Sequence, residues 1–113
     1  MLTISRLKEY GVDTESGLKR CVNNEALFLR LVGMVPNNDS FNKLYVALEN
    51  KNFDEAFTAA HSLKGILANL SINNILKPVQ EITELLRSKT DCDYSMYLKD
   101  IEEKRKVLEE LCK

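Results

Sequence analysis

The chain has 113 residues, of which 44% are hydrophobic and 29% are charged, with 16 Lys and Arg residues against 17 Asp and Glu residues. A chain of this length forms one domain around one core, which excludes a self-contained kinase or synthetase. The near-neutral net charge argues against binding to nucleic acid or to an anionic membrane, so we expect a protein partner.

The apolar residues and the cysteines set the expected compartment. No stretch approaches the ~18 apolar residues of a membrane span, and no secretory apolar core follows Met1. Cys21, Cys92 and Cys112 are widely spaced and include no C-x-x-C motif, which predicts three reduced thiols and no metal site. We therefore expect a cytoplasmic protein.

Helical periodicity, with only four Gly and two Pro in the chain, predicts an all-α protein. A helical turn around Ile4 and Leu7 stops at Gly11. Asp13 then caps a short helix that runs through Cys21. We expect these two short elements to cover one end of a helical bundle.

Two longer helices are predicted next. The first opens at Asn24 and is broken at Pro36, where the chain cannot continue a regular helix. The second is capped by Asp39 or Ser40 and ends at Asn50. The loop between them is short, which predicts that they are antiparallel neighbours.

The longest predicted helix before the C-terminus follows a capping box. Asn52 and Glu55 form this box, and the helix runs to about Leu70. Asn73 or Asn74 begins the next helix, whose apolar residues share one face.

A final loop over residues 89–93 precedes the terminal helix. Its apolar residues predict an inner face, and most of its charged side chains are expected on the outer side, among them Glu102, Glu103, Lys104 and Glu109. Together the elements predict an antiparallel up-and-down four-helix bundle with short additional N-terminal helices. Residues 1–113 are expected to form a single domain.

The chain contains one histidine, His61, in the helix after Asn52. At 100° per residue, the apolar side chains of this helix lie in an arc opposite it: Ala56, Ala59, Leu63, Ile66, Leu67 and Leu70. The imidazole is therefore predicted to point to solvent. An exposed imidazole is largely neutral near pH 7, so it has a lone pair that can attack phosphorus.

The neighbours of His61 favour a working surface. Gly65, one turn later, costs about 1 kcal/mol relative to Ala inside a helix, which suggests that a bare patch is kept there. Lys64 supplies a cation within reach of an anion on the ring. Phe57 and Ala68 extend the same face as apolar surface, as in a docking patch.

The segment Ala60-His61-Ser62-Leu63-Lys64-Gly65, continued by Ala68-Asn69-Leu70, closely resembles the A-H-x-L-K-G…N-L signature of histidine-containing phosphotransfer (HPt) domains. Other segments also resemble such domains, so most of the chain is covered: residues 17–20, 25–28, 44–48 and 53–56.

The resemblance implies a role for each site residue. His61 would carry the phosphoryl group on its outer ring nitrogen, and Gln80 or Thr83 of the following helix would bond the other nitrogen. Lys64 and Arg87 would orient the phosphate. The receiver would dock on a surface that includes Phe57, Thr58, Gly65 and Ala68.

The predicted function is that of a phosphorelay intermediate. His61 would accept a phosphoryl group from an aspartate on one receiver domain and pass it to an aspartate on another. The chain has no nucleotide-binding motif, so it is expected to be a monomeric phosphocarrier rather than an enzyme. It needs no cofactor of its own, because Mg²⁺ is expected on the receiver. The expected partners are receiver domains and a hybrid histidine kinase.

Three alternatives remain open. The chain could be a helical adaptor that binds a partner without taking phosphate, with His61 incidental. It could also be the phosphoacceptor domain of a larger chemotaxis-type or hybrid kinase, although Met1 and the helix that ends at Lys113 favour a free-standing protein. The most distant alternative is an enzyme that pairs His61 with Asp54 or Glu55 as general acid and base.

Overall fold

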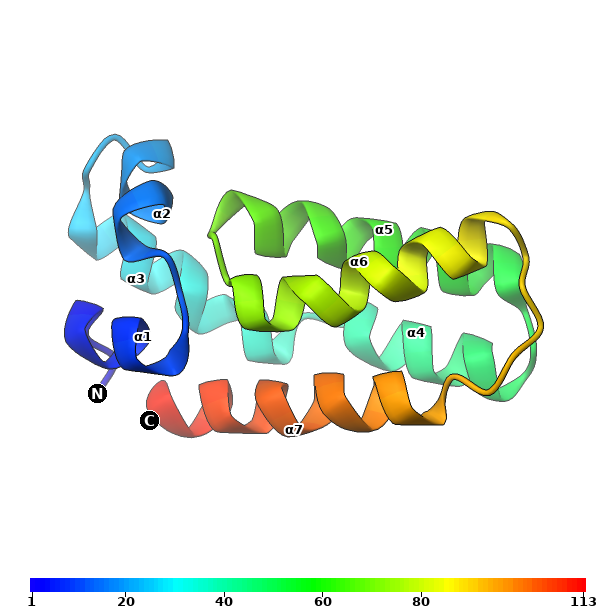
Figure 1. The fold of residues 1–113 in the computed structure, drawn as a ribbon. Helices are drawn as coiled ribbons and strands as arrows, with labels where there is room; N and C mark the ends of the chain where they lie inside the picture. The colour runs from blue at the N-terminus through cyan, green and yellow to red at the C-terminus, as the bar shows by residue number, and fades with distance from the viewer.

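The computed structural model describes all 113 residues, and every regular element in it is helical (Figure 1). The first half of the chain contains α1 (Ile4–Tyr10), α2 (Thr14–Arg20), α3 (Glu25–Met34), a one-turn 3-10 helix (Val35–Asn37) and α4 (Ser40–Glu49). The second half contains the three longest helices: α5 (Phe53–Asn69), α6 (Asn73–Arg87) and α7 (Ser95–Leu111). The prediction of an all-α protein is confirmed.

The helices form an elongated molecule that measures 41 × 24 × 19 Å. α5 packs between α4 and α6, and α6 also packs against α7. The short helices α1 and α2 lie with α3 at one end, as the blue and cyan segments of Figure 1 show. This agrees with the expectation that the N-terminal helices cover one end of the longer ones.

The prediction that α3 and α4 are antiparallel neighbours is wrong. The two helices follow one another along the length of the molecule, joined by the Val35–Asn37 turn (Figure 1). Pro36 ends the regular hydrogen-bonding of α3, but its fixed φ suits a 3-10 turn, so the chain continues forward instead of reversing. Arg105 of α7 donates to the Pro36 carbonyl at 2.7 Å, which holds the turn in place.

The hydrophobic core is a single cluster of 23 buried residues. The inner face of α5 contributes mainly small and branched side chains to it: Ala56, Ala59, Ala60, Leu63 and Leu67. The alanines on this face bring little bulk between α5 and its neighbours α4 and α6. Because one face of α5 is committed to the core, its opposite face is left at the surface.

Side-chain caps follow the sequence prediction at the starts of α2, α3 and α5. Side-chain oxygens accept from backbone N–H groups in the first turns of α2, α3 and α5, from Asp13, Asn24 and Asn52. At α4 the N-cap residue is Asp39, one of the two predicted, but its side chain makes no capping hydrogen bond. Asp39 already has helical φ and ψ, and Asn38 accepts the Ser40 N–H at 2.9 Å instead.

Glu102 was expected on the outer side of the terminal helix, but it is half-buried and joins α7 to α4. The Tyr45 hydroxyl donates to its carboxylate at 2.6 Å, and Arg105 Nε donates at 2.9 Å. The Arg105 guanidinium also lies over the Phe41 ring, 5.6 Å from its centroid. The hydrogen bond from Arg105 is the main cause that lowers the pKa of Glu102. This part of the charged run is therefore a structural link and not a solvated face.

Arg20, at the end of α2, joins the N-terminal helices to the end of α5. Its guanidinium donates to the Ala68 carbonyl at 3.0 Å and to the Ser71 hydroxyl. The carbonyl groups in the last turn of a helix lack partners within the helix, and they form its negative end. A cation from α2 thus stabilises the C-terminal end of the helix that contains His61.

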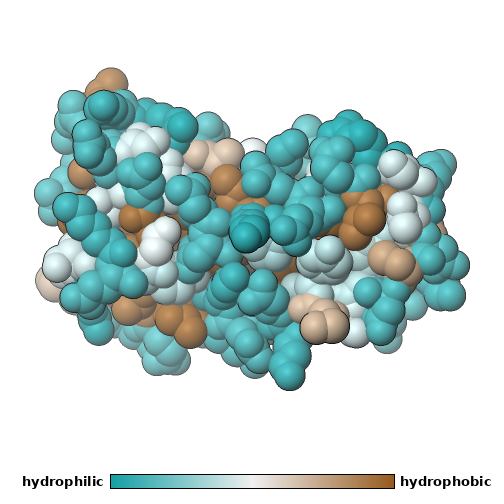
Figure 2. Space-filling view, in the orientation of Figure 1, coloured by the Kyte–Doolittle hydropathy of each residue, from teal (hydrophilic) through white to brown (hydrophobic).

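Hydrophilic residues cover most of the face that Figure 2 shows, and hydrophobic residues appear on it as small, separate areas. No helix of the structure combines the length and the apolar character needed to cross a membrane.

Candidate functional site

His61 lies near the middle of α5, and its side chain is exposed. No hydrogen bond or ion pair joins the imidazole to the rest of the protein, so both ring nitrogens are unpartnered. Ala60 and Leu63 are buried on the inner face of α5, so the helix directs His61 to the outer face. The prediction that the imidazole points to solvent is confirmed. A group from outside the molecule can therefore approach the imidazole.

Gly65 lies one turn after His61 and leaves open space beside it. A Cβ atom added at Gly65 would meet nothing within 4 Å, and the residue is exposed. Its backbone is in a regular helix, so neither packing nor an unusual φ requires a glycine here. What the glycine does provide is a stretch of α5 backbone that another molecule can approach closely.

Lys64, three residues after His61, is the basic residue nearest to it in the sequence. Its side chain is partly exposed and forms no ion pair or hydrogen bond with the protein. Arg87, in contrast, is paired with the Glu84 carboxylate. Lys64 therefore remains available to an anion that arrives at His61.

Phe57 contacts the imidazole from one turn before it. The centroids of the two rings are 5.7 Å apart, and their planes are inclined by 32°. The Arg87 guanidinium lies over the Phe57 ring, 5.1 Å from its centroid, and Arg87 Nε is 3.3 Å from the Glu84 carboxylate. Arg87 thus reaches the surroundings of His61, as expected, but its contact is with Phe57.

An ion pair extends this contact between α5 and the end of α6. Lys89 Nζ lies 3.3 Å from the Asp54 carboxylate, at the start of α5. Sequence reasoning missed both this pair and the stacking of Arg87 on Phe57. The sequence contained a signal for both contacts. Residues at similar sequence distances from the tight turn between two antiparallel helices lie opposite each other, as Phe57 and Arg87 do on either side of the turn between α5 and α6.

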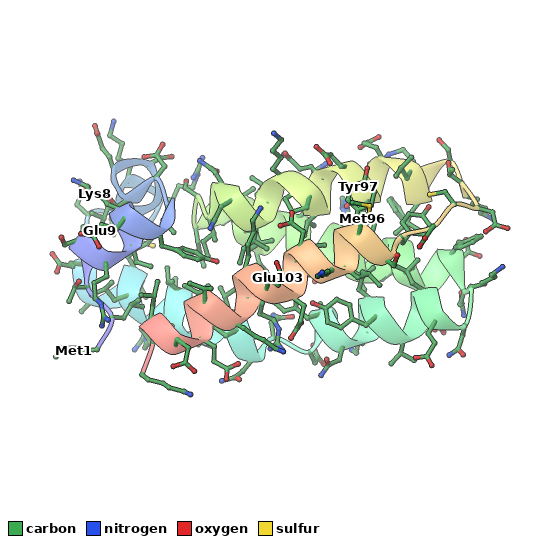
Figure 3. All side chains as sticks on the ribbon, turned by 60° about the horizontal axis from the view of Figure 1, so that its bottom comes forward. Met1, Lys8, Glu9, Met96, Tyr97 and Glu103 are labelled. Atoms are coloured by element: carbon green, nitrogen blue, oxygen red, sulfur yellow. The ribbon has the colours of Figure 1, made fainter.

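Thr83 and Gln80 do not bond the imidazole, which corrects the prediction made for them. Thr83 is fully buried, and its hydroxyl donates to the Val79 carbonyl at 2.6 Å. Gln80 is exposed and borders a surface hollow on the side of α7, together with Ser88 and Tyr97. Figure 3 labels Tyr97 at the beginning of α7. The two positions differ by only about 60° around the axis of α6, and this rotation is enough to separate the surface position of Gln80 from the buried position of Thr83.

The predicted docking residues lie along one side of α5, and with His61 they are called the His61 face: Phe57, Thr58, His61, Gly65 and Ala68. Thr58 and Gly65 are exposed, whereas Phe57 and Ala68 are half-buried. Thr58 also borders a groove between α4 and α5 that has Val46 at its edge. The face thus combines open backbone, one aromatic ring and small side chains around the imidazole.

Comparison of the chain with family models, with curated proteins and with solved structures found no match. The geometry of α5 and α6 and the sequence around His61 are therefore the observations from which a function is inferred.

Proposed function

We propose that this chain is a histidine phosphotransfer protein of a two-component phosphorelay. His61 accepts a phosphoryl group from an aspartate on a receiver domain and passes it to an aspartate on another. The observation that carries the proposal is the exposed, unpartnered imidazole of His61 beside the open space at Gly65. A surface of this kind admits a second protein to the nucleophile.

The fold supports the same proposal. An HPt domain of this chain would use α4, α5, α6 and α7 as an antiparallel up-and-down four-helix bundle, with α1 and α2 as additional N-terminal helices. The position of α5 between α4 and α6, and the packing of α6 on α7, support this arrangement. It exposes the middle of α5, far from the fraying ends of the helix.

The transfer step needs a neutral imidazole. The lone pair of one His61 ring nitrogen attacks phosphorus as the bond from phosphorus to the partner's aspartate oxygen breaks. The aspartate leaves as a carboxylate with the bonding electron pair, and the phosphoryl group becomes attached to His61. The other ring nitrogen keeps its hydrogen, so the imidazole bears a positive charge until that proton is lost. The reverse step delivers the phosphoryl group to the next receiver.

Phosphoryl transfer depends mostly on positioning and charge stabilisation. The receiver supplies its Mg²⁺ and acidic pocket, so this chain needs no cofactor and acts as a phosphocarrier. Lys64 is the unpaired cation nearest to His61 in sequence and would interact with the phosphoryl oxygens. This contribution is modest, because an exposed ion pair is worth ~0.2–1 kcal/mol.

The His61 face is the proposed docking surface for receiver domains, one of which would belong to a hybrid histidine kinase. At Gly65 the receiver can approach the backbone of α5 near the imidazole. Phe57 and Ala68 offer apolar contact. Such a protein would act as a monomer in the cytoplasm.

The decisive experiment offers the protein a panel of receiver domains charged with acetyl phosphate. We expect an acid-labile label on His61 that His61→Gln abolishes, with the helical circular dichroism spectrum unchanged. Ser62→Ala is the matched control, since it removes the adjacent hydroxyl and should leave the label in place. An acid-stable label, or a label that survives His61→Gln, would exclude the proposed carrier.

The same variant tests the adaptor alternative. If a receiver binds His61→Gln as tightly as the natural chain while transfer is lost, His61 acts as the phosphoacceptor and the other residues of the His61 face provide the docking contact. Loss of binding together with loss of phosphate acceptance would favour an adaptor that uses the His61 side chain for contact.

A further inference from the structure

Three side chains form a stack across α5 and α6. The Arg87 guanidinium lies 5.1 Å from the Phe57 centroid, and the Phe57 ring lies 5.7 Å from the His61 ring. Phe57 is therefore the middle member, in contact with a cation and with the imidazole.

The three members of the stack are held differently. Phe57 is half-buried and packs against the hydrophobic core, and the Glu84 carboxylate holds Arg87 at 3.3 Å. His61 has no hydrogen bond or ion pair of its own. The contact with Phe57 is thus the interaction that restricts the rotation of the imidazole.

We propose that Phe57 is a positioning residue for His61, and that Arg87 acts through Phe57 by holding its ring in place. The proposal rests on the phosphotransfer function only for its consequence in catalysis. An exposed histidine side chain samples several rotamers. All but one of them are lost when the lone pair aligns with phosphorus, and that loss costs conformational entropy. An aromatic neighbour at 5.7 Å reduces that freedom before the partner arrives.

The geometry suits this role because the rings stack at a tilt of 32°. A tilted stack covers part of one ring face, and it leaves the exposed side chain without a hydrogen-bond partner at either nitrogen. A hydrogen bond to a ring nitrogen would fix the ring more firmly. It would also engage either the nitrogen that attacks phosphorus or the one that keeps its hydrogen during transfer.

The first test measures the imidazole directly and does not depend on phosphotransfer. His61 is the only histidine, so its ring C–H signals in ¹H–¹³C NMR spectra need no assignment against others. We expect ring-current shifts from Phe57 in the natural chain, preserved in Phe57→Tyr and lost in Phe57→Leu. Identical His61 signals in the natural chain and in Phe57→Leu would overturn the proposal.

The second test measures transfer kinetics with the receiver that reacts fastest in the panel. Phe57→Leu keeps an apolar side chain in the core and should lower the maximal rate roughly three- to tenfold, the scale of an aromatic contact. The fall in maximal rate should persist at saturating receiver, where the loss of a docking contact alone has no effect on the rate, and Phe57→Tyr should restore the rate. Arg87→Gln should give a smaller loss of the same kind.

The outcomes separate this proposal from the proposed function. A change in half-maximal receiver concentration at an unchanged maximal rate would limit Phe57 to a docking contact and overturn the positioning role. If no receiver labels His61, the phosphotransfer function fails, and the NMR comparison still decides whether Phe57 orients the ring. Thermal unfolding of each variant identifies a loss that reflects instability alone.

Discussion

Gly17 and Gly65 are both helical glycines, yet they serve opposite purposes. A Cβ atom at Gly17 would collide with the Phe28 ring and come within 2.9 Å of the Leu70 carbonyl oxygen, whereas one at Gly65 would meet nothing. Gly17 lets α2 pack closely on its neighbours, and Gly65 leaves α5 uncovered. The structure gives no packing reason for a glycine at position 65, and the proposed approach of a partner to His61 would account for it.

Alanine at each position is the sharpest test of that contrast. Gly17→Ala should lower the free energy of unfolding by about 1–3 kcal/mol, because the added methyl group overpacks a site closed by backbone. Gly65→Ala should raise it by about 0.5–1 kcal/mol, since alanine is the better helix former and has room there. Chemical denaturation of the two variants measures both. A similar change at the two positions would contradict the comparison.

A bulky charge at Gly65 should separate function from folding. Gly65→Glu is expected to slow transfer from a charged receiver by about tenfold or more, equivalent to ~1.4 kcal/mol, because it blocks the approach to His61 and repels phosphate. The free energy of unfolding should change little. Gly33→Glu on α3 is the matched control, as a side chain there also has open space. Unchanged transfer in Gly65→Glu would show that the partner does not use the gap.

Replacement of Lys64 should have the smallest effect. Lys64→Ala should reduce transfer by no more than about fivefold, because an exposed cation contributes only ~0.2–1 kcal/mol. Lys64→Arg keeps the charge and should retain most of the rate. Single-turnover transfer from a charged receiver measures both variants. A loss as large as that of His61→Gln would show that Lys64 has a greater role than its exposure indicates.

Local sequence signals predicted most helices because those signals act within a few residues. Asn24 and Asn52 cap helices as expected, and the apolar spacing of α5 placed His61 outside. The path of the chain through Pro36 could not be predicted in the same way. A short loop is compatible with reversal or with continuation, and the choice here depends on a bond to Arg105, far along the chain.

The candidate site was predictable on α5 and less so across the helix interface. His61, Lys64 and Gly65 lie on one helix, so their relative directions follow from its period. The environment of Thr83 depends on the rotation of α6 between α5 and α7, which periodicity specified too coarsely to separate a buried position from a surface one. To predict the contact of Arg87 with Phe57, the register between α5 and α6 had to be known as well as the face of each helix.

The bond from Arg20 to the end of α5 has a consequence for the dynamics of the molecule. Because the Arg20 side chain of α2 bonds the Ala68 carbonyl and the Ser71 hydroxyl, the last turn of α5 frays less readily while α2 stays in place. Amide hydrogen exchange in that turn should therefore report on detachment of the N-terminal segment. A ligand that detaches α2 would therefore increase amide exchange at the C-terminal end of α5, the helix that contains His61.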